Sequence, residues 1–298
     1  TLMHGHPDAA EKLARTGTAD LSYSLPSRAR FRVNIFQQRG VYSIVMRVIP
    51  TDIPTLKSLG LPSQLSEIAE LRNGLVLVTG PTGSGKSSTQ ASIIDIINEK
   101  KYYHIVTIED PIEYLHLHKR STINQREVGH DTRDFPSALR AALRQAPKVI
   151  LIGEMRDVET IEIAMEAAET GHLVLSTLHT NDAPGAVTRL IEMGIEPFLV
   201  SSAIDCVVAQ RLARKLCQHC KERGIISAEI LRANGIRSQF DMEAYGARGC
   251  PRCNHSGYKG RVGLYEVMTV SDDIRSMAIQ RDPVCRANST RRASPTVA

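Results

Sequence analysis

The stretch Gly80-Pro81-Thr82-Gly83-Ser84-Gly85-Lys86-Ser87 decides the fold that we expect for this chain. It fits the pattern of a phosphate-binding loop, in which a glycine and four further residues lead into Gly-Lys-Ser. Glycines let backbone N–H groups turn toward phosphate oxygens, and the N-terminus of a following helix adds positive potential. The stretch, with Ser88 beside it, is therefore predicted to bind a nucleoside triphosphate. Lys86 would reach the β- and γ-phosphates, and the Ser87 hydroxyl would be a ligand of Mg²⁺.

The residues on either side of the loop provide the context that such a site requires. The apolar run Leu75-Val76-Leu77-Val78 precedes it and predicts a buried strand. Residues 88–97 follow it, and Ile93, Ile94 and Ile97 recur at helical spacing. A glycine-rich turn before a helix is the alternative, but strand, loop and helix in this order favour a nucleotide site.

Strands and helices alternate along the central part of the chain. Helices such as those expected at Ala138–Arg144 and Val158–Thr170 separate the predicted strands. This order predicts an α/β fold with a mostly parallel sheet and helices on both faces, in which ligands bind beyond the carboxyl ends of the strands. The strands are predicted at Leu75–Thr79, Ile105–Ile108, Val149–Ile152 and Leu173–Leu178.

The remainder of the chain suggests smaller regions on either side of this core. Phe31, Val33 and Ile35 alternate with polar residues, as in a half-buried strand. About fifty N-terminal residues are few for an independent core, and the chain does not begin with Met, so we expect an upstream portion to be missing. The expected division is a partial α+β domain at 1–50, a linker at 51–64, the nucleotide-binding core at 65–210, a tetracysteine element at 211–262, and a helical segment and tail at 263–298.

Composition and charge narrow the class of protein. Of the 298 residues 42% are hydrophobic, which is ordinary for a folded domain, and no apolar run approaches the roughly 20 residues that span a bilayer. The first residues have neither a basic start nor an apolar core, so no signal peptide is predicted. The formal net charge of +5 permits contact with nucleic acid or anionic membranes without favouring either.

Acidic residues follow two of the predicted strands. Glu154 stands where the second nucleotide motif places a carboxylate beside Mg²⁺, at the end of an apolar strand. Glu109, Asp110 and Glu113 follow another strand, and three carboxylates so close repel one another unless a cation compensates. Mg²⁺ and an attacking water would give this cluster a catalytic role, and a solvent-facing acidic turn is the alternative.

His179 directly follows the strand predicted to end at Leu178, so it is expected at the same edge of the sheet. A histidine there could sense the γ-phosphate. The alternative is a structural histidine whose ring is satisfied by its neighbours.

Four cysteines form the second strong pattern in the chain. Two Cys-x-x-Cys pairs, with the 29 residues 221–249 between them, supply four thiolates suited to a tetrahedral Zn²⁺ site. Disulfides are the alternative, but nothing in the sequence marks a secreted protein. The predicted zinc ligands are Cys217, Cys220, Cys250 and Cys253, and the remaining cysteines, Cys206 and Cys285, are expected to be plain thiols.

Taken together, these motifs resemble the secretion ATPases of type II secretion systems and type IV pili, the PilT, PilB and GspE group. The resemblance covers residues 21–268. The N-terminal segment resembles the retraction branch, whereas the four cysteines are more typical of the assembly and secretion branch. Within the family's motifs, residues 80–87 match Walker A, 107–114 resemble the acidic box, 153–157 resemble Walker B, and 171–180 resemble the histidine box.

The resemblance implies that the partial N-terminal domain at 1–50 is PAS-like. It also implies that residues 65–210 form a RecA-like ATPase core, which hydrolyses ATP with Mg²⁺. Glu154 would support Mg²⁺ and the attacking water, Glu109 would polarise that water, and His179 would sense the γ-phosphate. Arg30 and Arg32 on the N-terminal strand would act as arginine fingers, with a solvated strand face as the alternative.

The resemblance also implies partners and a location. It implies a homohexameric ring with nucleotide sites between subunits, in the cytoplasm and peripheral to the inner membrane. A membrane platform protein of the pilus or secretion machine would be the partner, the zinc would be structural, and no nucleic acid is expected.

Two other classes of function remain as alternatives. A RecA-like nucleic-acid-dependent ATPase, such as a helicase or loader, would suit the zinc module and the basic tail, but the chain lacks a clear basic and aromatic surface for DNA. A non-catalytic nucleotide switch would require missing carboxylates, whereas Glu109 and Glu154 are both present.

Overall fold

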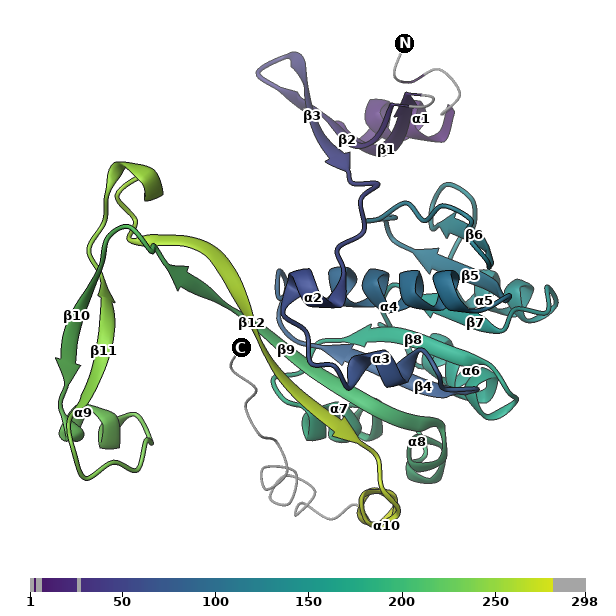
Figure 1. Cartoon of the computed structure of the whole chain (residues 1–298). Coiled ribbons are helices and arrows are strands. Elements are labelled where there is room, and N and C mark those ends of the chain that lie inside the picture. Colours follow the sequence, from purple (N-terminus) through teal and green to yellow (C-terminus); the bar gives the residue numbers. More distant parts are fainter. Residues whose placement is uncertain (1–2, 4–6, 26–27, 281–298) are drawn as a thin grey trace. The chain divides into compact units, whose positions relative to one another are not determined.

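The computed structural model describes residues 3, 7–25 and 28–280. The chain divides into two compact units, of which the first comprises Thr1–Gln210 and Tyr265–Ala298 and the second Arg211–Leu264. Figure 1 labels their helices and strands. The tail at 281–298, including Cys285, lies outside the described residues.

A seven-stranded sheet forms the centre of the first unit. Its order is β12-β9-β4-β8-β7-β5-β6, and the pairs β9·β4, β4·β8, β8·β7, β7·β5 and β5·β6 are all parallel. The fold class predicted from the sequence, a mostly parallel α/β sheet, is therefore confirmed. The strands are β4 (Gly74–Thr79), β5 (His104–Glu109), β6 (Thr122–Glu127), β7 (Val149–Ile152), β8 (Leu173–Leu178), β9 (Ile204–Leu216) and β12 (Tyr258–Thr269).

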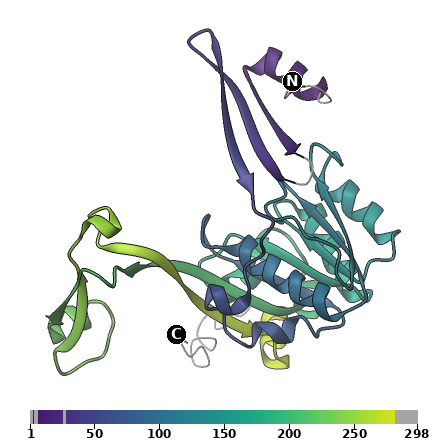
Figure 2. The ribbon, with the colours of Figure 1, turned by 45° about the horizontal axis from the view of Figure 1, so that its top comes forward.

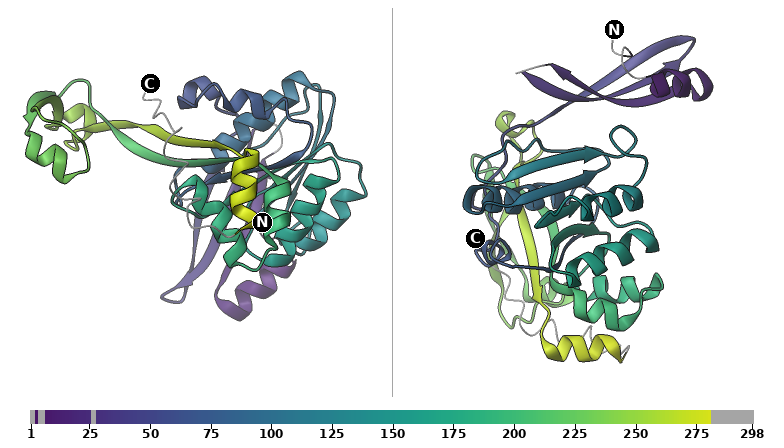
Figure 3. Two further views of the ribbon diagram at one scale, coloured as in Figure 1. Left: turned by 90° about the horizontal axis from the view of Figure 1, so that it is seen from below. Right: turned by 90° about the vertical axis from the view of Figure 1, so that its right-hand side faces the viewer.

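Helices cover both faces of this sheet (Figures 1 and 3). Successive strand residues point to opposite faces, so Leu75 and Leu77 join one apolar cluster and Val76 joins the other. The first cluster contains side chains of α5 (Phe135–Leu143), α6 (Val158–Glu169), α7 (Ala183–Glu192), α8 (Pro197–Ala203) and α10 (Asp272–Ile279). The second contains side chains of α2 (Leu56–Leu59), α3 (Leu65–Ile68) and α4 (Lys86–Lys100).

Three helices on the first face begin at an aspartate. The carboxylates of Asp134, Asp157 and Asp182 accept hydrogen bonds from the backbone N–H three residues later, at the start of α5, α6 and α7. Each such cap stabilises its helix by about 1 kcal/mol, because it satisfies an N–H that has no partner within the helix. These caps fix where the chain turns from a loop into a helix.

The N-terminal part of the first unit is a separate three-stranded antiparallel sheet of order β1-β2-β3, with α1 (Pro7–Thr16) before it (Figure 2). Its small core contains Leu21, Val33 and Ile35. The strands are β1 (Thr18–Leu25), β2 (Ala29–Gln38) and β3 (Val41–Ile49). The edge strand β3 exposes large apolar side chains, namely Val41, Tyr42, Ile44, Val45, Met46 and Val48.

The second unit contains a two-stranded antiparallel sheet, β10 (Lys221–Ile226) with β11 (Met242–Ala247), and the short helices α9 (Ala228–Ala233) and η1 (Pro251–Cys253). One expectation from the sequence, a helical segment that starts at residue 263, needs correction. Residues 263–269 are instead the end of strand β12. Tyr265 and Val267 pack against the second apolar cluster with period two, which a strand satisfies and a helix does not. Helix α10 begins only at Asp272.

No helix among residues 3, 7–25 and 28–280 combines the length and the apolar character that a membrane span needs.

Candidate nucleotide-binding site

The predicted phosphate-binding loop lies between β4 and α4, and α4 begins at Lys86. Gly83 and Gly85 have φ angles of 78° and 90°, which turn the backbone through the left-handed region. Gly80 has a φ of 146°, and a Cβ there would lie 2.3 Å from the backbone oxygen of Gln210. Only glycine fits this close approach, so the first residue of the pattern is explained by packing against β9.

Lys86 extends back over the loop that precedes it. Its Nζ donates hydrogen bonds to the carbonyl oxygens of Gly80, at 2.9 Å, and Pro81, at 3.3 Å. Burial lowers the pKa of the Lys86 ammonium, while the nearby carboxylates of Glu154 and Glu113 raise it. The loop therefore holds a cation close to two acidic side chains.

The first turn of α4 supplies hydroxyl groups beside this lysine. Ser87 is half-buried there, and the Ser88 hydroxyl lies 2.7 Å from the Tyr114 hydroxyl. Tyr114 belongs to the segment that follows β5. Helix α4 and the acidic segment are thus joined at the same edge of the sheet.

Hydroxyl groups also link the strand ends around the loop. The Thr79 hydroxyl accepts from the backbone N–H of Thr180 at 2.9 Å, and the two threonine hydroxyls lie 2.6 Å apart. The Thr177 hydroxyl donates to the carbonyl oxygen of Gly153 at 2.8 Å. These bonds hold the ends of β4, β8 and β7 together, and so fix the backbone from which Glu154 and His179 project.

Glu154 and His179 come together at this edge. His179 Nε2 lies 3.7 Å from one carboxylate oxygen of Glu154, and the Arg156 guanidinium forms an ion pair with the other. Arg156 also lies 3.7 Å from a carboxylate oxygen of Asp110. The positive charge of Arg156 therefore compensates part of the negative charge of the acidic cluster that the sequence showed. The sequence analysis did not single out Arg156.

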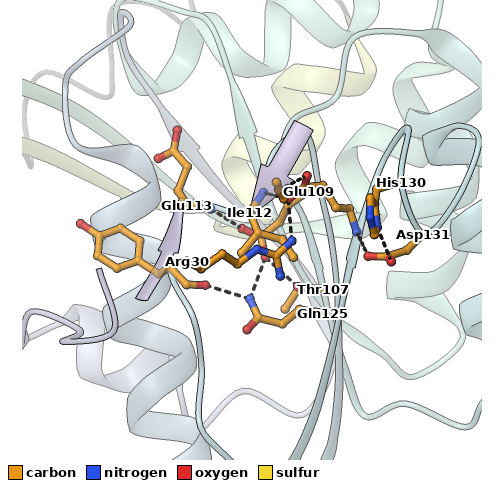
Figure 4. A network of polar contacts seen from close by, with 11 residues as sticks. Arg30, Thr107, Glu109, Ile112, Glu113, Gln125, His130 and Asp131 are labelled. Carbon is orange, nitrogen blue, oxygen red and sulfur yellow. Dashed lines mark hydrogen bonds and ion pairs between the residues drawn. The ribbon is translucent and has the colours of Figure 1, made fainter. Parts of the chain in front are cut away.

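Glu109 is buried at the end of β5, with 9% of its surface exposed. Its carboxylate accepts hydrogen bonds from the Thr107 hydroxyl at 2.6 Å and the Gln125 amide at 3.1 Å, and more weakly from the backbone N–H of Glu113 at 3.5 Å (Figure 4). Burial raises the pKa of Glu109, and these hydrogen bonds lower it in part. A carboxylate of this kind is a stronger base than an exposed one.

Arg30, predicted as an arginine finger, is paired with a carboxylate in the structure. Arg30 Nη2 lies 3.1 Å from Glu127 Oε2, and Glu127 also accepts from the Ser22 hydroxyl and the backbone N–H of Ile112. Figure 4 shows Arg30 beside the Glu109 network. Arg32, the second predicted finger, is exposed.

Sequence reasoning missed Glu127, although a signal for it existed. Glu127 ends β6 and pairs in register with Glu109 at the end of β5, so it is a second acid at the edge where ligands bind. It also missed Gln210, a buried amide that directly follows the apolar run Cys206–Ala209 on β9.

In the second unit the four predicted cysteines form one cluster, in which all sulfur atoms lie within 4.8 Å of one another. The measured separations are 4.0 Å for Cys217 and Cys250, and 3.8 Å both for Cys220 and Cys253 and for Cys250 and Cys253. Four sulfurs at about 2.3 Å from one Zn²⁺ stand about 3.8 Å apart in a tetrahedron, so the cluster fits that ion. A disulfide would require about 2.05 Å, and the four thiols are free.

Cys206 lies apart from this cluster, buried on β9 in the sheet. Burial raises the pKa of its thiol to about 12. A thiol that stays protonated at neutral pH is neither a nucleophile nor a metal ligand, as expected for a plain core cysteine.

The family of type II/IV secretion system proteins matches residues 8–297. The chain belongs to this family. The type IV pilus retractation ATPase PilT of Pseudomonas aeruginosa is 47% identical to it over 203 residues, which are 66% of this chain and 59% of that protein. The type II secretion system ATPase E of Vibrio cholerae is 43% identical over 241 residues, which are 78% of this chain and 47% of that protein. The chain thus spans about half the length of these curated relatives.

The fold of this chain is also similar to that of a solved structure. The crystal structure of the pilus retraction motor PilT with bound ADP matches 97% of this chain and 74% of that chain, with a TM-score of 0.78 and 38% sequence identity. The resemblance to the secretion ATPases that the motifs indicated is therefore confirmed.

Proposed function

We propose that this chain hydrolyses ATP and is part of the motor of a type IV pilus or type II secretion machine. The observation that carries the proposal is the gathering of Lys86, Glu154, Glu109 and His179 at the carboxyl ends of four neighbouring strands, β4, β7, β5 and β8. Membership of the secretion family and the ATPases among its relatives support the same activity.

Some of these residues would bind the phosphates, and others would activate the attacking water. The backbone N–H groups of residues 82–88 and the Lys86 ammonium would bind the phosphates and offset the charge that develops on the leaving group. Glu109, whose pKa is raised by burial, would accept the proton of the attacking water. His179, 3.7 Å from Glu154, would contact the γ-phosphate.

Mg²⁺ would be held by the Ser87 hydroxyl and, through water, by Glu154, and these hard oxygen donors suit that ion. Bound there, the ion would neutralise part of the negative charge of the phosphates. Glu154 lies close enough to Lys86 for its charge to raise the pKa of the lysine. This proximity supports a shared role of the two side chains at the phosphates.

We propose Arg30 and Arg32 as arginine fingers in a ring of subunits. Arg30 is paired with Glu127, so it would have to exchange this carboxylate for the phosphates in order to act on them. We further propose a homohexamer with sites between subunits, which acts at the cytoplasmic side of the inner membrane on a platform protein. Membership of the secretion family supports this proposal.

We also propose one structural Zn²⁺ at Cys217, Cys220, Cys250 and Cys253. The sulfur separations support it. Backbone N–H groups of Cys250 and Gly257 donate to the Cys253 sulfur, both at 3.2 Å, as expected around a metal-bound thiolate.

The substitution Glu154→Gln tests the proposed activity. We expect ATP hydrolysis by the assembled protein to fall by about 10²-fold or more, because the charge beside Mg²⁺ and the water is lost, while ADP binding persists. Glu159→Gln is the control, because Glu159 is an exposed acid on α6 that pairs with Arg140. Unchanged hydrolysis in Glu154→Gln would refute the proposal. Stimulation of the wild type by single-stranded DNA would favour a helicase or loader instead.

The substitution Glu109→Gln is expected to stabilise the fold while slowing turnover by about 10²-fold, the usual effect of removing a general base. Because burial raises the pKa of Glu109, its ionised form destabilises the folded state as pH rises from the unfolded pKa toward the folded one. The melting temperature of Glu109→Gln should therefore exceed that of the wild type at pH 8, with a smaller difference at pH 5. A lower melting temperature at pH 8 would contradict this account.

A further inference from the structure

Gln210 is a buried polar residue with no part in the phosphate-binding pattern. It lies on β9, one residue after Ala209, which pairs with Thr79 at the end of β4. Only 3% of its surface is exposed. A buried amide is costly unless its oxygen and its N–H groups find partners, so the partners of Gln210 show what holds it there.

The two partners of the Gln210 side chain lie in the phosphate-binding loop and in the helix that follows it. Its Nε2 donates to the carbonyl oxygen of Ser84 at 2.7 Å, and its Oε1 accepts from the Thr89 hydroxyl at 2.7 Å. A carbonyl oxygen can only accept, so the amide nitrogen must face Ser84 and the amide oxygen must face Thr89. The side chain thus connects the loop to the second turn of α4.

The backbone of Gln210 holds the other end of the same loop. Its carbonyl oxygen lies 2.3 Å from the position that a Cβ on Gly80 would take, so Gly80 packs directly against it. The first glycine of the loop, its Ser84 and its helix are all fixed by one residue of β9.

The contact to Ser84 has a directional consequence. In a trans peptide the C=O and the following N–H point in opposite directions. Because Gln210 holds the Ser84 carbonyl toward β9, the N–H of Gly85 is directed away from β9. An N–H fixed in this way is available to a phosphate oxygen without reorganisation on binding.

We propose that Gln210 is a positioning residue that sets the shape of the phosphate-binding loop for the diphosphate group of a bound nucleotide. This rests on the proposed nucleotide-binding function and adds a residue outside the loop on which affinity depends. If Gln210 served the stability of the core alone, its loss would lower the melting temperature and leave nucleotide affinity unchanged in the folded protein.

The test is ADP binding to the full chain, measured by calorimetry, together with the KM for ATP. In Gln210→Met, which keeps the length of the side chain and removes both hydrogen bonds, we expect the Kd for ADP and the KM for ATP to rise about tenfold, with a smaller change in kcat. Thr89→Val should raise the Kd for ADP and the KM for ATP about threefold each. Thr89→Ser, which keeps the hydroxyl, should have wild-type values of both constants.

Gln90→Met is the matched control. Gln90 is equally buried on α4, its Nε2 has no hydrogen-bond partner, and the same substitution there leaves the contacts of Gln210 intact. The proposal is overturned if folded Gln210→Met binds ADP like the wild type, or if Gln90→Met weakens binding as much. If Gln210→Met does not fold, equal ADP affinity in Thr89→Val and the wild type overturns it. A wild type that binds neither ADP nor ATP would instead refute the proposed function itself, and this proposal with it.

Discussion

Replacing Lys86 by alanine is expected to abolish ATP turnover, with a fall of at least about 10³-fold. The Nζ of Lys86 is the cation that the loop holds over its own carbonyl oxygens, those of Gly80 and Pro81. Without it no ammonium offsets the charge of the β- and γ-phosphates, either on binding or in the transition state. Release of inorganic phosphate from Mg-ATP, measured with the assembled protein, checks this.

The matched control is Lys100→Ala at the other end of the same helix. Lys100 is an exposed lysine that pairs with Glu70, so its loss removes an equal charge from α4 without touching the loop. Wild-type turnover is expected in this variant. Near-wild-type turnover in Lys86→Ala would show that the loop is not the site of hydrolysis.

Replacing Cys217 by serine is expected to remove bound zinc entirely and to unfold the second unit. Within residues 211–264, all of which the structure describes, the buried apolar side chains are those of Cys217, Ala228, Leu231 and Cys253. So small a core cannot offset the conformational entropy of folding, whereas a structural zinc ion contributes roughly 10–16 kcal/mol at pH 7. Elemental analysis should find one zinc in the wild type and none in the variant.

Limited proteolysis measures the structural part of this expectation. Cleavage within residues 211–264 should become fast in Cys217→Ser and in wild type treated with a chelator. Cys206→Ala controls for the loss of a thiol, because Cys206 lies in the sheet and should leave the zinc content unchanged. A wild-type protein without zinc would rule out the metal site.

Much of the sheet was predictable because its strands are apolar on both faces. The runs at Val149–Ile152 and Leu173–Leu178 are the observed strands β7 and β8. A parallel strand buried on both sides leaves an unbroken apolar run, and the polar residues that follow it fall at one edge. Local sequence therefore placed Glu109, Glu154 and His179 near the loop before any contact was known.

The partners of these residues could not be predicted in the same way. The contact of Arg30 with Glu127 joins residues 97 positions apart, and that of Gln210 with Ser84 joins residues 126 positions apart. Both depend on which strands become neighbours and in which register, and no local pattern encodes that. The end of β12 is not predictable for a related reason, because the packing of Tyr265 and Val267 against the sheet decides that these residues form a strand.

The exposed edge strand β3 also affects how the protein must be handled. It lies at the end of the order β1-β2-β3, so no strand of the part of the chain that the structure describes pairs with its outer side, and its large apolar side chains at 41–48 are exposed. Such an edge is a template for β-pairing between molecules, so aggregation should increase steeply with protein concentration. Calorimetry and turnover assays on this chain are best run dilute, with light scattering recorded alongside, so that a loss of signal through aggregation is not mistaken for a loss of function.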